Sequence, residues 1–70
     1  MNWIETPESS NIDRFKYDEG NQVLAVEFKH GGVYEYFDVP PSIFEQMQSA
    51  SSKGQFLAQN IKGHYRYARV

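Results

Sequence analysis

A predicted β-hairpin near the middle of the chain constrains the fold more than any other feature of the sequence. Apolar side chains alternate at Leu24, Val26 and Phe28, which is the period of a strand with one buried face. The sequence His30-Gly31-Gly32 is typical of a turn, and residues 33–37 then alternate again. These residues therefore predict two antiparallel strands joined by a short loop.

The length of that loop decides where Tyr34 and Tyr36 point. If Gly31 ends a three-residue loop with a positive φ, both tyrosines share the face of Leu24 and Val26. With a two-residue loop they would point to the opposite face, because side chains alternate along a strand. We predict the three-residue loop, since glycine supplies the positive φ that it requires. The tyrosine rings would then lie against the core.

Flanking patterns complete an α+β fold. Residues 12–17 predict a strand before the hairpin, and Pro41 begins a helix over residues 41–50. Ser52 is a good N-cap for a second helix over residues 53–62, and Gly63 is suited to end it. Residues 9–70 are thus expected to form one domain, with a three-stranded antiparallel meander, two helices and a possible short C-terminal edge strand. Residues 1–8 are expected to form a loose leader, although Trp3 and Ile4 could dock on the core.

The chain has 70 residues and no cysteine, so its core has no disulfide to support it. Aromatic side chains, which bury large apolar areas, can stabilise such a core in place of a disulfide. The two periodicities predict a core made of Leu24, Val26, Phe28, Phe44, Met47, Phe56, Leu57 and Ile61.

Composition also narrows the function. The first residues lack the basic start and apolar run of a secretory signal, and no stretch is apolar enough for a membrane span, so a cytoplasmic location is expected. His30 and His64 are far apart and have no metal-ligand spacing to other residues. The sequence therefore predicts no metal, no cofactor and no enzymatic activity, with no catalytic residue to name.

Charge is unevenly distributed. Residues 1–45 contain all nine acidic residues and three basic ones, a net charge of −6, whereas residues 46–70 carry four basic residues and a net charge of +4. Such asymmetry is typical of a protein with an electrostatic partner. The alternative is that the two halves neutralise each other within the fold. If the basic residues gather on one side, they would form a single anion-binding strip.

Aromatic and basic residues supply the candidates for binding. Tyr34 and Tyr36 could stack nucleic-acid bases, or they could simply be core residues. Basic and aromatic residues interleave from Tyr65 to Arg69, as they do in nucleic-acid-binding segments, although edge strands also carry charge to avoid pairing. Ser52 and Lys53 at a helix start suit an anion, or act as a plain cap. The candidate nucleic-acid-binding residues are Tyr34, Tyr36, Ser52, Lys53, Lys62, Tyr65, Arg66 and Arg69.

The order of these elements resembles the KTSC domain, a small domain named after the C-terminus of some lysyl-tRNA synthetases and also found as a stand-alone bacterial protein. The resemblance spans residues 9–67 and rests on Leu24, Val26, Phe28, Tyr34, Tyr36, Val39, Pro40, Ser52, Gly54, Phe56, Ile61 and Tyr65. It implies a small α+β fold and no reaction. RNA binding has been suggested for the family, because of the synthetase association and the Tyr-x-Tyr element.

Two functional hypotheses follow. The first is a small binding module for nucleic acid, in particular RNA, approached through the basic C-terminal third. The second is a protein-interaction or structural module, for example a homodimer, that uses an apolar or edge-strand surface. Binding of RNA through basic side chains weakens steeply with salt, whereas an apolar interface does not, so salt dependence separates the two.

Overall fold

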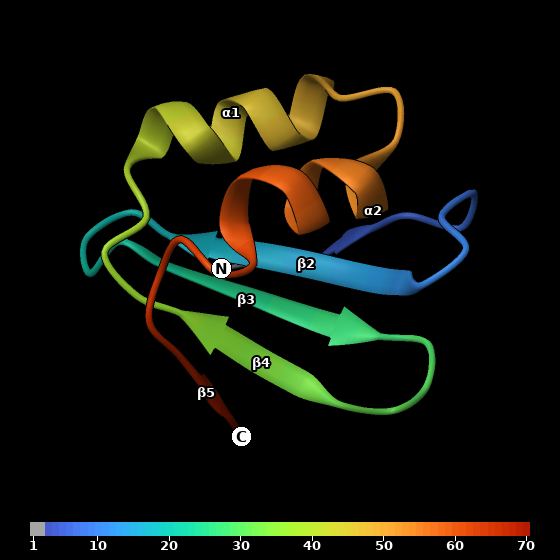
Figure 1. The fold of residues 1–70 in the computed structure, drawn as a ribbon, viewed down its shortest axis with the longest axis horizontal. Helices are drawn as coiled ribbons and strands as arrows, with labels where there is room; N and C mark the ends of the chain where they lie inside the picture. The colour runs from blue at the N-terminus through green and yellow to red at the C-terminus, as the bar shows by residue number, and fades with distance from the viewer. Residues whose placement is uncertain (1–2) are drawn as a thin grey trace.

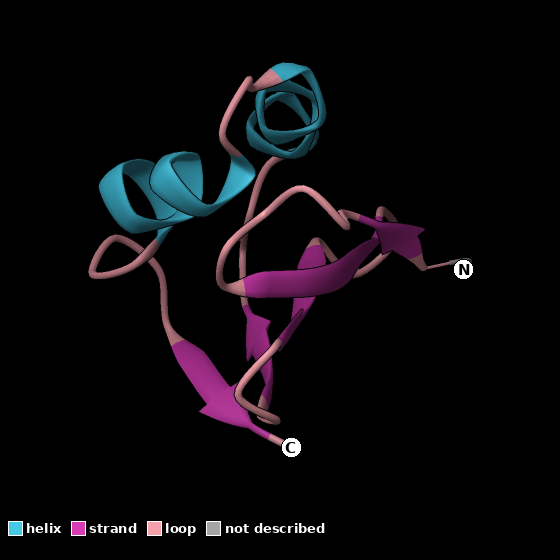
Figure 2. Cartoon of the chain, turned by 90° about the vertical axis from the view of Figure 1, so that its right-hand side faces the viewer, coloured by secondary structure: helices cyan, strands magenta, loops and turns pink. Residues whose placement is uncertain are grey.

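The computed structural model describes residues 3–70, which form an antiparallel sheet covered on one face by helices (Figures 1 and 2). Within these residues the sheet has five strands in the order β1-β2-β3-β4-β5, and the helices lie between β4 and β5 in the chain. The elements are β1 (Ile4–Glu5), β2 (Ile12–Asp18), β3 (Val23–Phe28), β4 (Val33–Tyr36), α1 (Pro41–Ser49), α2 (Lys53–Phe56), η1 (Leu57–Ile61) and β5 (Tyr67–Arg69).

The α+β class and the antiparallel meander are as the sequence predicts, but the strand count is larger. The C-terminal edge strand is present as β5, paired with β4. A further strand, β1, lies at the other edge, where Ile4 pairs with Phe15 of β2. Two residues are too few to show alternation, so no sequence pattern predicts β1. Ile4 packs against the core, while Met1 and Asn2 of the expected leader lie outside the described residues.

Thr6 anchors the chain that follows β1. Its side chain is fully buried, and its hydroxyl donates a hydrogen bond to the Ile12 carbonyl at 2.8 Å. Its backbone N–H donates to the Asp13 carbonyl at 3.1 Å. Because both polar groups are satisfied, a buried threonine is tolerated here and holds β1 against β2.

The three-residue hairpin loop is confirmed. Gly31 has a φ of +107°, and its N–H donates to the Phe28 carbonyl at 2.9 Å. The resulting register pairs Val26 with Tyr34 and Leu24 with Tyr36. Both tyrosines therefore lie on the core face of the sheet, beneath the helices.

The core lies between that face and the helices. Of the predicted core, Phe44 and Phe56 are only partly buried, and the remaining members are buried. The ring of Phe44 stacks on Tyr17, with centroids 4.7 Å apart. The buried hydrophobic residues are Ile12, Phe15, Tyr17, Leu24, Ala25, Val26, Phe28, Tyr36, Val39, Met47, Leu57 and Ile61.

The helical segment after α1 begins and ends as predicted but is not one regular helix. Ser52 caps it by accepting a hydrogen bond from the Gln55 N–H, and Gly63 follows its end with a φ of +82°. The second half, η1, is a π-helix, in which the Lys62 N–H donates to the Leu57 carbonyl at 2.8 Å. The sequence predicts a helix here but not its type, since helical periodicity in a sequence does not distinguish an α-turn from a single π-turn.

None of the helices formed by residues 3–70 is both long and apolar enough to cross a membrane.

Candidate functional site

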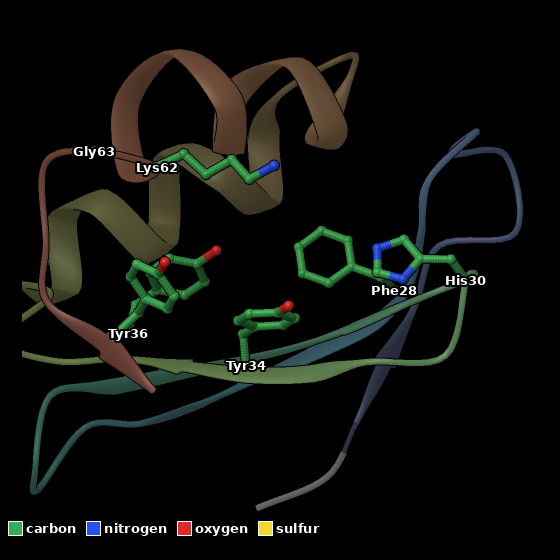
Figure 3. A pocket seen from close by; sticks show the side chains of 7 residues that line it. Phe28, His30, Tyr34, Tyr36, Lys62 and Gly63 are labelled. Atoms are coloured by element: carbon green, nitrogen blue, oxygen red, sulfur yellow. The ribbon is translucent and has the colours of Figure 1, made fainter. Parts of the chain in front are cut away.

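A hollow of about 390 Å³ opens between the β4–β5 edge of the sheet and the end of the helical segment (Figure 3). We call it the aromatic pocket. Residues from four parts of the chain line it: the end of β3 and the turn after it, β4, the residues after η1, and β5. The lining residues are Phe28, His30, Tyr34, Tyr36, Lys62, Gly63 and Tyr67.

Strand alternation and register bring the aromatic rings together. Tyr34 and Tyr36 are two residues apart on β4 and therefore share a face of the sheet. Tyr67, on β5, is paired with Tyr36. Ring centroids lie 5.9 Å apart for Tyr34 and Tyr67 and 5.8 Å apart for Tyr36 and Tyr67. Phe28 meets Tyr34 edge to face, with centroids 5.5 Å apart at 83°. The result is a continuous aromatic wall on the core face of the sheet.

Gly32 makes room for this wall. A Cβ at this position would lie 2.9 Å from Cε1 of Tyr34, closer than non-bonded carbon atoms approach each other in proteins. The two glycines of the turn therefore have different tasks: Gly31 provides the positive φ, and Gly32 allows the Tyr34 ring to lie over the backbone.

The π-turn places Lys62 above the pocket. The segment ends one residue before Lys62, whose Nζ lies 5.8 Å from the centroid of the Phe28 ring. Figure 3 shows the side chain extending from the helical segment across the top of the pocket, while the rings rise from the sheet below. A cation is thus held opposite the aromatic wall.

Tyr36 forms the most enclosed part of the wall. It is 3% exposed, and burial raises the pKa of its phenol, with smaller contributions from the neighbouring Tyr67 and Tyr34. None of residues 3–70 makes a hydrogen bond to its hydroxyl, yet the oxygen is not sealed from solvent. Tyr17, also 3% exposed, differs because its hydroxyl donates to the Val39 carbonyl. The Tyr36 hydroxyl is therefore available inside the pocket.

The charges beside the pocket are positive. Besides Lys62, the Arg69 guanidinium lies 5.9 Å from the centre of the Tyr34 ring. His30 stacks on Phe28, with centroids 5.3 Å apart and planes at 7°. No aspartate or glutamate is among the lining residues. The pocket therefore suits a planar ligand that carries negative charge.

Residues 8–65 match the KTSC domain. The chain belongs to the KTSC domain family. This confirms the resemblance predicted from the sequence.

The relatives of this KTSC domain include both fused and small proteins. It is 45% identical over 64 residues to a lysine–tRNA ligase of Nostoc punctiforme, covering 91% of this chain but only 11% of the ligase. A protein of Tsukamurella paurometabola is 39% identical over 63 residues, which is 90% of this chain and 94% of that protein. The crystal structure of a KTSC domain protein from Yersinia pestis superimposes with a TM-score of 0.93 at 32% identity, covering 99% of this chain and 96% of that one.

The structure brings only some of the predicted site residues together. Tyr34, Tyr36 and Lys62 line the aromatic pocket, and Arg69 lies beside it. Tyr65 is partly buried and packs against the core, so it contributes to the fold rather than to the pocket.

Ser52 and Lys53 lie elsewhere, against a separate hollow with residues 8–10. The Lys53 Nζ donates to the Ala50 carbonyl at 3.2 Å, and Ser52 acts as an N-cap. About nine helical residues separate Lys53 from Lys62, roughly 13 Å along the axis at about 1.5 Å per residue. These two cations are therefore at opposite ends of the helical segment.

Arg66 is also excluded from the pocket. Its guanidinium lies 5.5 Å from the Phe37 ring centre and pairs with Asp38 at 3.0 Å, with both partners exposed. Arg66 and Arg69 are an odd number of residues apart, so alternation directs them to opposite faces of the sheet. The expected strip of four cations is thus not formed, and Lys62 and Arg69 alone among those four lie at the pocket.

Some pocket residues are not among the sequence candidates. Phe28 is predicted only as core, His30 only as part of the turn, and Gly63 only as the end of a helix. The available signal is the adjacency of His30-Gly31-Gly32 to Tyr-x-Tyr, because a hairpin loop lies beside the first residues of the returning strand. Tyr67 belongs to the interleaved C-terminal segment, but its pairing with Tyr36 depends on the β4–β5 register.

Proposed function

We propose that this KTSC domain is a non-catalytic module that binds single-stranded RNA through the aromatic pocket. The observation that carries the proposal is an aromatic wall with Lys62 and Arg69 beside it and no carboxylate in its lining. Modules that bind single strands combine aromatic platforms, on which bases stack, with cations that contact the backbone. Base stacking of this kind contributes about 1–3 kcal/mol per base.

The lining residues favour binding over catalysis. His30 is the only histidine among them, and its ring stacks on Phe28. Among the described residues that line the pocket, none is a serine, a cysteine, an aspartate or a glutamate. In Ser-His and Cys-His catalysis the histidine acts with such a nucleophile and is oriented by a carboxylate or amide, and the described residues that line the pocket include none of these.

The lysine–tRNA ligase relatives support RNA as the ligand, because their name includes a tRNA. This chain spans only 11% of such a ligase, so the support concerns the domain and not the ligase activity. The net charge of −2 argues against general attraction to polyanions and favours a local site.

Salt dependence provides a quantitative test of how many cations take part. For single strands, the logarithm of the binding constant falls with the logarithm of salt concentration with a slope of about −0.7 per neutralised phosphate. Two cations, Lys62 and Arg69, therefore predict a slope of about −1.4, and a strip of four would predict about −2.8. A slope near zero would contradict ionic contact by the pocket.

The two arginines of the C-terminal segment give a matched pair of variants. Arg69→Glu and Arg66→Glu change the net charge equally, but only Arg69 lies by the pocket. In NMR titrations with a short single-stranded oligoribonucleotide, we expect Arg69→Glu to weaken binding roughly tenfold and Arg66→Glu to have a much smaller effect. Equal losses of RNA affinity in the two variants would indicate non-specific charge attraction. If neither variant loses affinity, the pocket is not part of the RNA interface.

The open edge of β5 favours a second candidate, pairing with another protein or with a second copy of the chain. The Arg66 carbonyl accepts from the N–H of Phe37, the residue after β4, and the Val70 N–H donates to the Val33 carbonyl. Alternation therefore directs the N–H and C=O groups of Tyr67 and Arg69 away from β4. Such an edge is a template for a further strand. Sedimentation velocity tests self-association: a dimer with β5 amides protected from hydrogen exchange supports it, and a monomer at NMR concentrations contradicts it.

A further inference from the structure

The Tyr36 hydroxyl is an unpaired polar group at the bottom of an apolar wall. The Tyr36 side chain is only 3% exposed. Its hydroxyl has no hydrogen-bond partner among residues 3–70, and the oxygen still reaches the pocket. In Figure 3 the hydroxyl points away from the sheet, into the space below Lys62. A buried hydroxyl without a partner in the protein is satisfied when a ligand brings a hydrogen-bonding group to it. The ligand therefore has hydrogen-bonding atoms as well as an apolar surface.

The ring arrangement leaves room for a flat group. Phe28 stands at 83° to Tyr34, and Tyr67 is tilted by 44° from Tyr34 and by 37° from Tyr36. None of these pairs stacks face to face, so the tyrosine rings do not cover each other's faces. Figure 3 shows the Tyr34 ring as the floor of the space, with Phe28 on one side and Tyr36 on the other. A planar heteroaromatic ring fits this arrangement by stacking.

The size of the pocket limits the ligand. A hollow of about 390 Å³ is near the lower end of the range of small-molecule sites, which runs from about 300 to 1,000 Å³. It holds one base and its sugar, not several stacked bases. Lys62 above and Arg69 beside the floor add a requirement for negative charge and oppose a cationic ligand.

A nucleotide meets all of these requirements. Building on the RNA-binding function proposed above, we infer that the aromatic pocket holds one unpaired nucleotide, whose base lies on Tyr34 and hydrogen-bonds the Tyr36 hydroxyl while its phosphate contacts Lys62. Tyr36 is then the residue that distinguishes a base from a purely apolar ring. The nucleotide can be part of an RNA strand or free in solution, since both present the same chemistry to the pocket.

Mononucleotides test this inference directly. The probes are AMP, GMP, CMP and UMP, the four matching nucleosides, ribose 5-phosphate and a single-stranded oligoribonucleotide, each titrated into ¹⁵N-labelled protein. At least one monophosphate should saturably shift the amides of Tyr34, Tyr36, Lys62 and Tyr67. The matching nucleoside and ribose 5-phosphate should each bind roughly tenfold or more weakly, because each lacks one of the two contacts.

Tyr36→Phe tests the hydroxyl, and Tyr17→Phe is its matched control. Both variants remove one hydroxyl from an equally buried tyrosine, but the Tyr17 hydroxyl bonds the Val39 carbonyl outside the pocket. We expect Tyr36→Phe to fold and to bind the monophosphate about tenfold more weakly, the effect of one lost hydrogen bond. Tyr17→Phe should bind as wild type does. Unchanged binding by Tyr36→Phe overturns the role of the hydroxyl.

The probes also separate failure of this inference from failure of the RNA-binding function. If the oligoribonucleotide shifts the pocket amides and no monophosphate binds, the single-nucleotide site is overturned while RNA binding is supported. If monophosphates bind and the oligoribonucleotide does not, the nucleotide site is supported as a site for free nucleotides and RNA binding is overturned. If neither binds, both are overturned.

Discussion

Truncation of Tyr36 tests whether the aromatic wall is part of the core as well as a binding surface. Tyr36 is 3% exposed, and its ring belongs to the hydrophobic core cluster. Replacing a buried aromatic side chain by alanine costs about 3–5 kcal/mol, from lost burial and the cavity left behind. One side of Tyr36 adjoins the pocket, where water can enter the vacated space, so we expect a cost near the lower value, about 3 kcal/mol.

That loss is large for a domain of this size. At roughly 0.05–0.15 kcal/mol per residue, a chain of 70 residues has a free energy of unfolding of about 4–10 kcal/mol. In small domains each 1 kcal/mol changes the melting temperature by about 4–8 °C, so Tyr36→Ala should lower it by roughly 12 °C or more. Urea unfolding followed by circular dichroism gives the free energy, and thermal melting gives the temperature.

Tyr67→Ala is the control for this experiment. Tyr67 is paired with Tyr36 and lines the same pocket but is 61% exposed, so its truncation should cost less than about 1 kcal/mol. Similar losses for the two variants, or a Tyr36→Ala protein within about 1 kcal/mol of wild type, would refute the assignment of Tyr36 to the core.

Three further perturbations test local features. Gly32→Ala places a Cβ 2.9 Å from the Tyr34 ring, so we expect it to displace that ring and weaken ligand binding more than it lowers the melting temperature; unchanged Tyr34 ring chemical shifts in NMR spectra would contradict this. Burial raises the pKa of Tyr36, so above about pH 10 the unfolded chain loses this proton first and stability falls as pH rises. Urea unfolding across that range should show a smaller fall for Tyr36→Phe. Gly54→Ala usually stabilises a helix by up to about 1 kcal/mol, but here the Cβ would overlap the Asn11 amide, so thermal melting should show no gain or a loss.

Local features of the sequence determined the hairpin. The largest apolar side chains, Leu24, Val26 and Phe28, recur at every second residue, and Gly31 alone in that loop takes the positive φ observed. Together these fix the register, and the register fixes the face of Tyr34 and Tyr36. Helix limits were predictable for the same reason, since Pro41, Ser52 and Gly63 act on backbone groups within one turn of themselves.

Tertiary structure decided how distant residues come together. Lys53 and Lys62 are separated by the length of a helical segment, and the π-turn that places Lys62 over Phe28 has no signature in residue periodicity. Arg66 pairs with Asp38, whereas Arg69 is paired with Tyr34 and lies by its ring, and these neighbours depend on how the C-terminal segment docks on β4. Strand β1 forms only because β2 offers it a free edge and Thr6 can bury its hydroxyl. Hydrophobic periodicity and turn residues determine the structure of a few residues at a time. The pocket depends on the docking of four segments, which is set by side-chain packing rather than by local conformational preference.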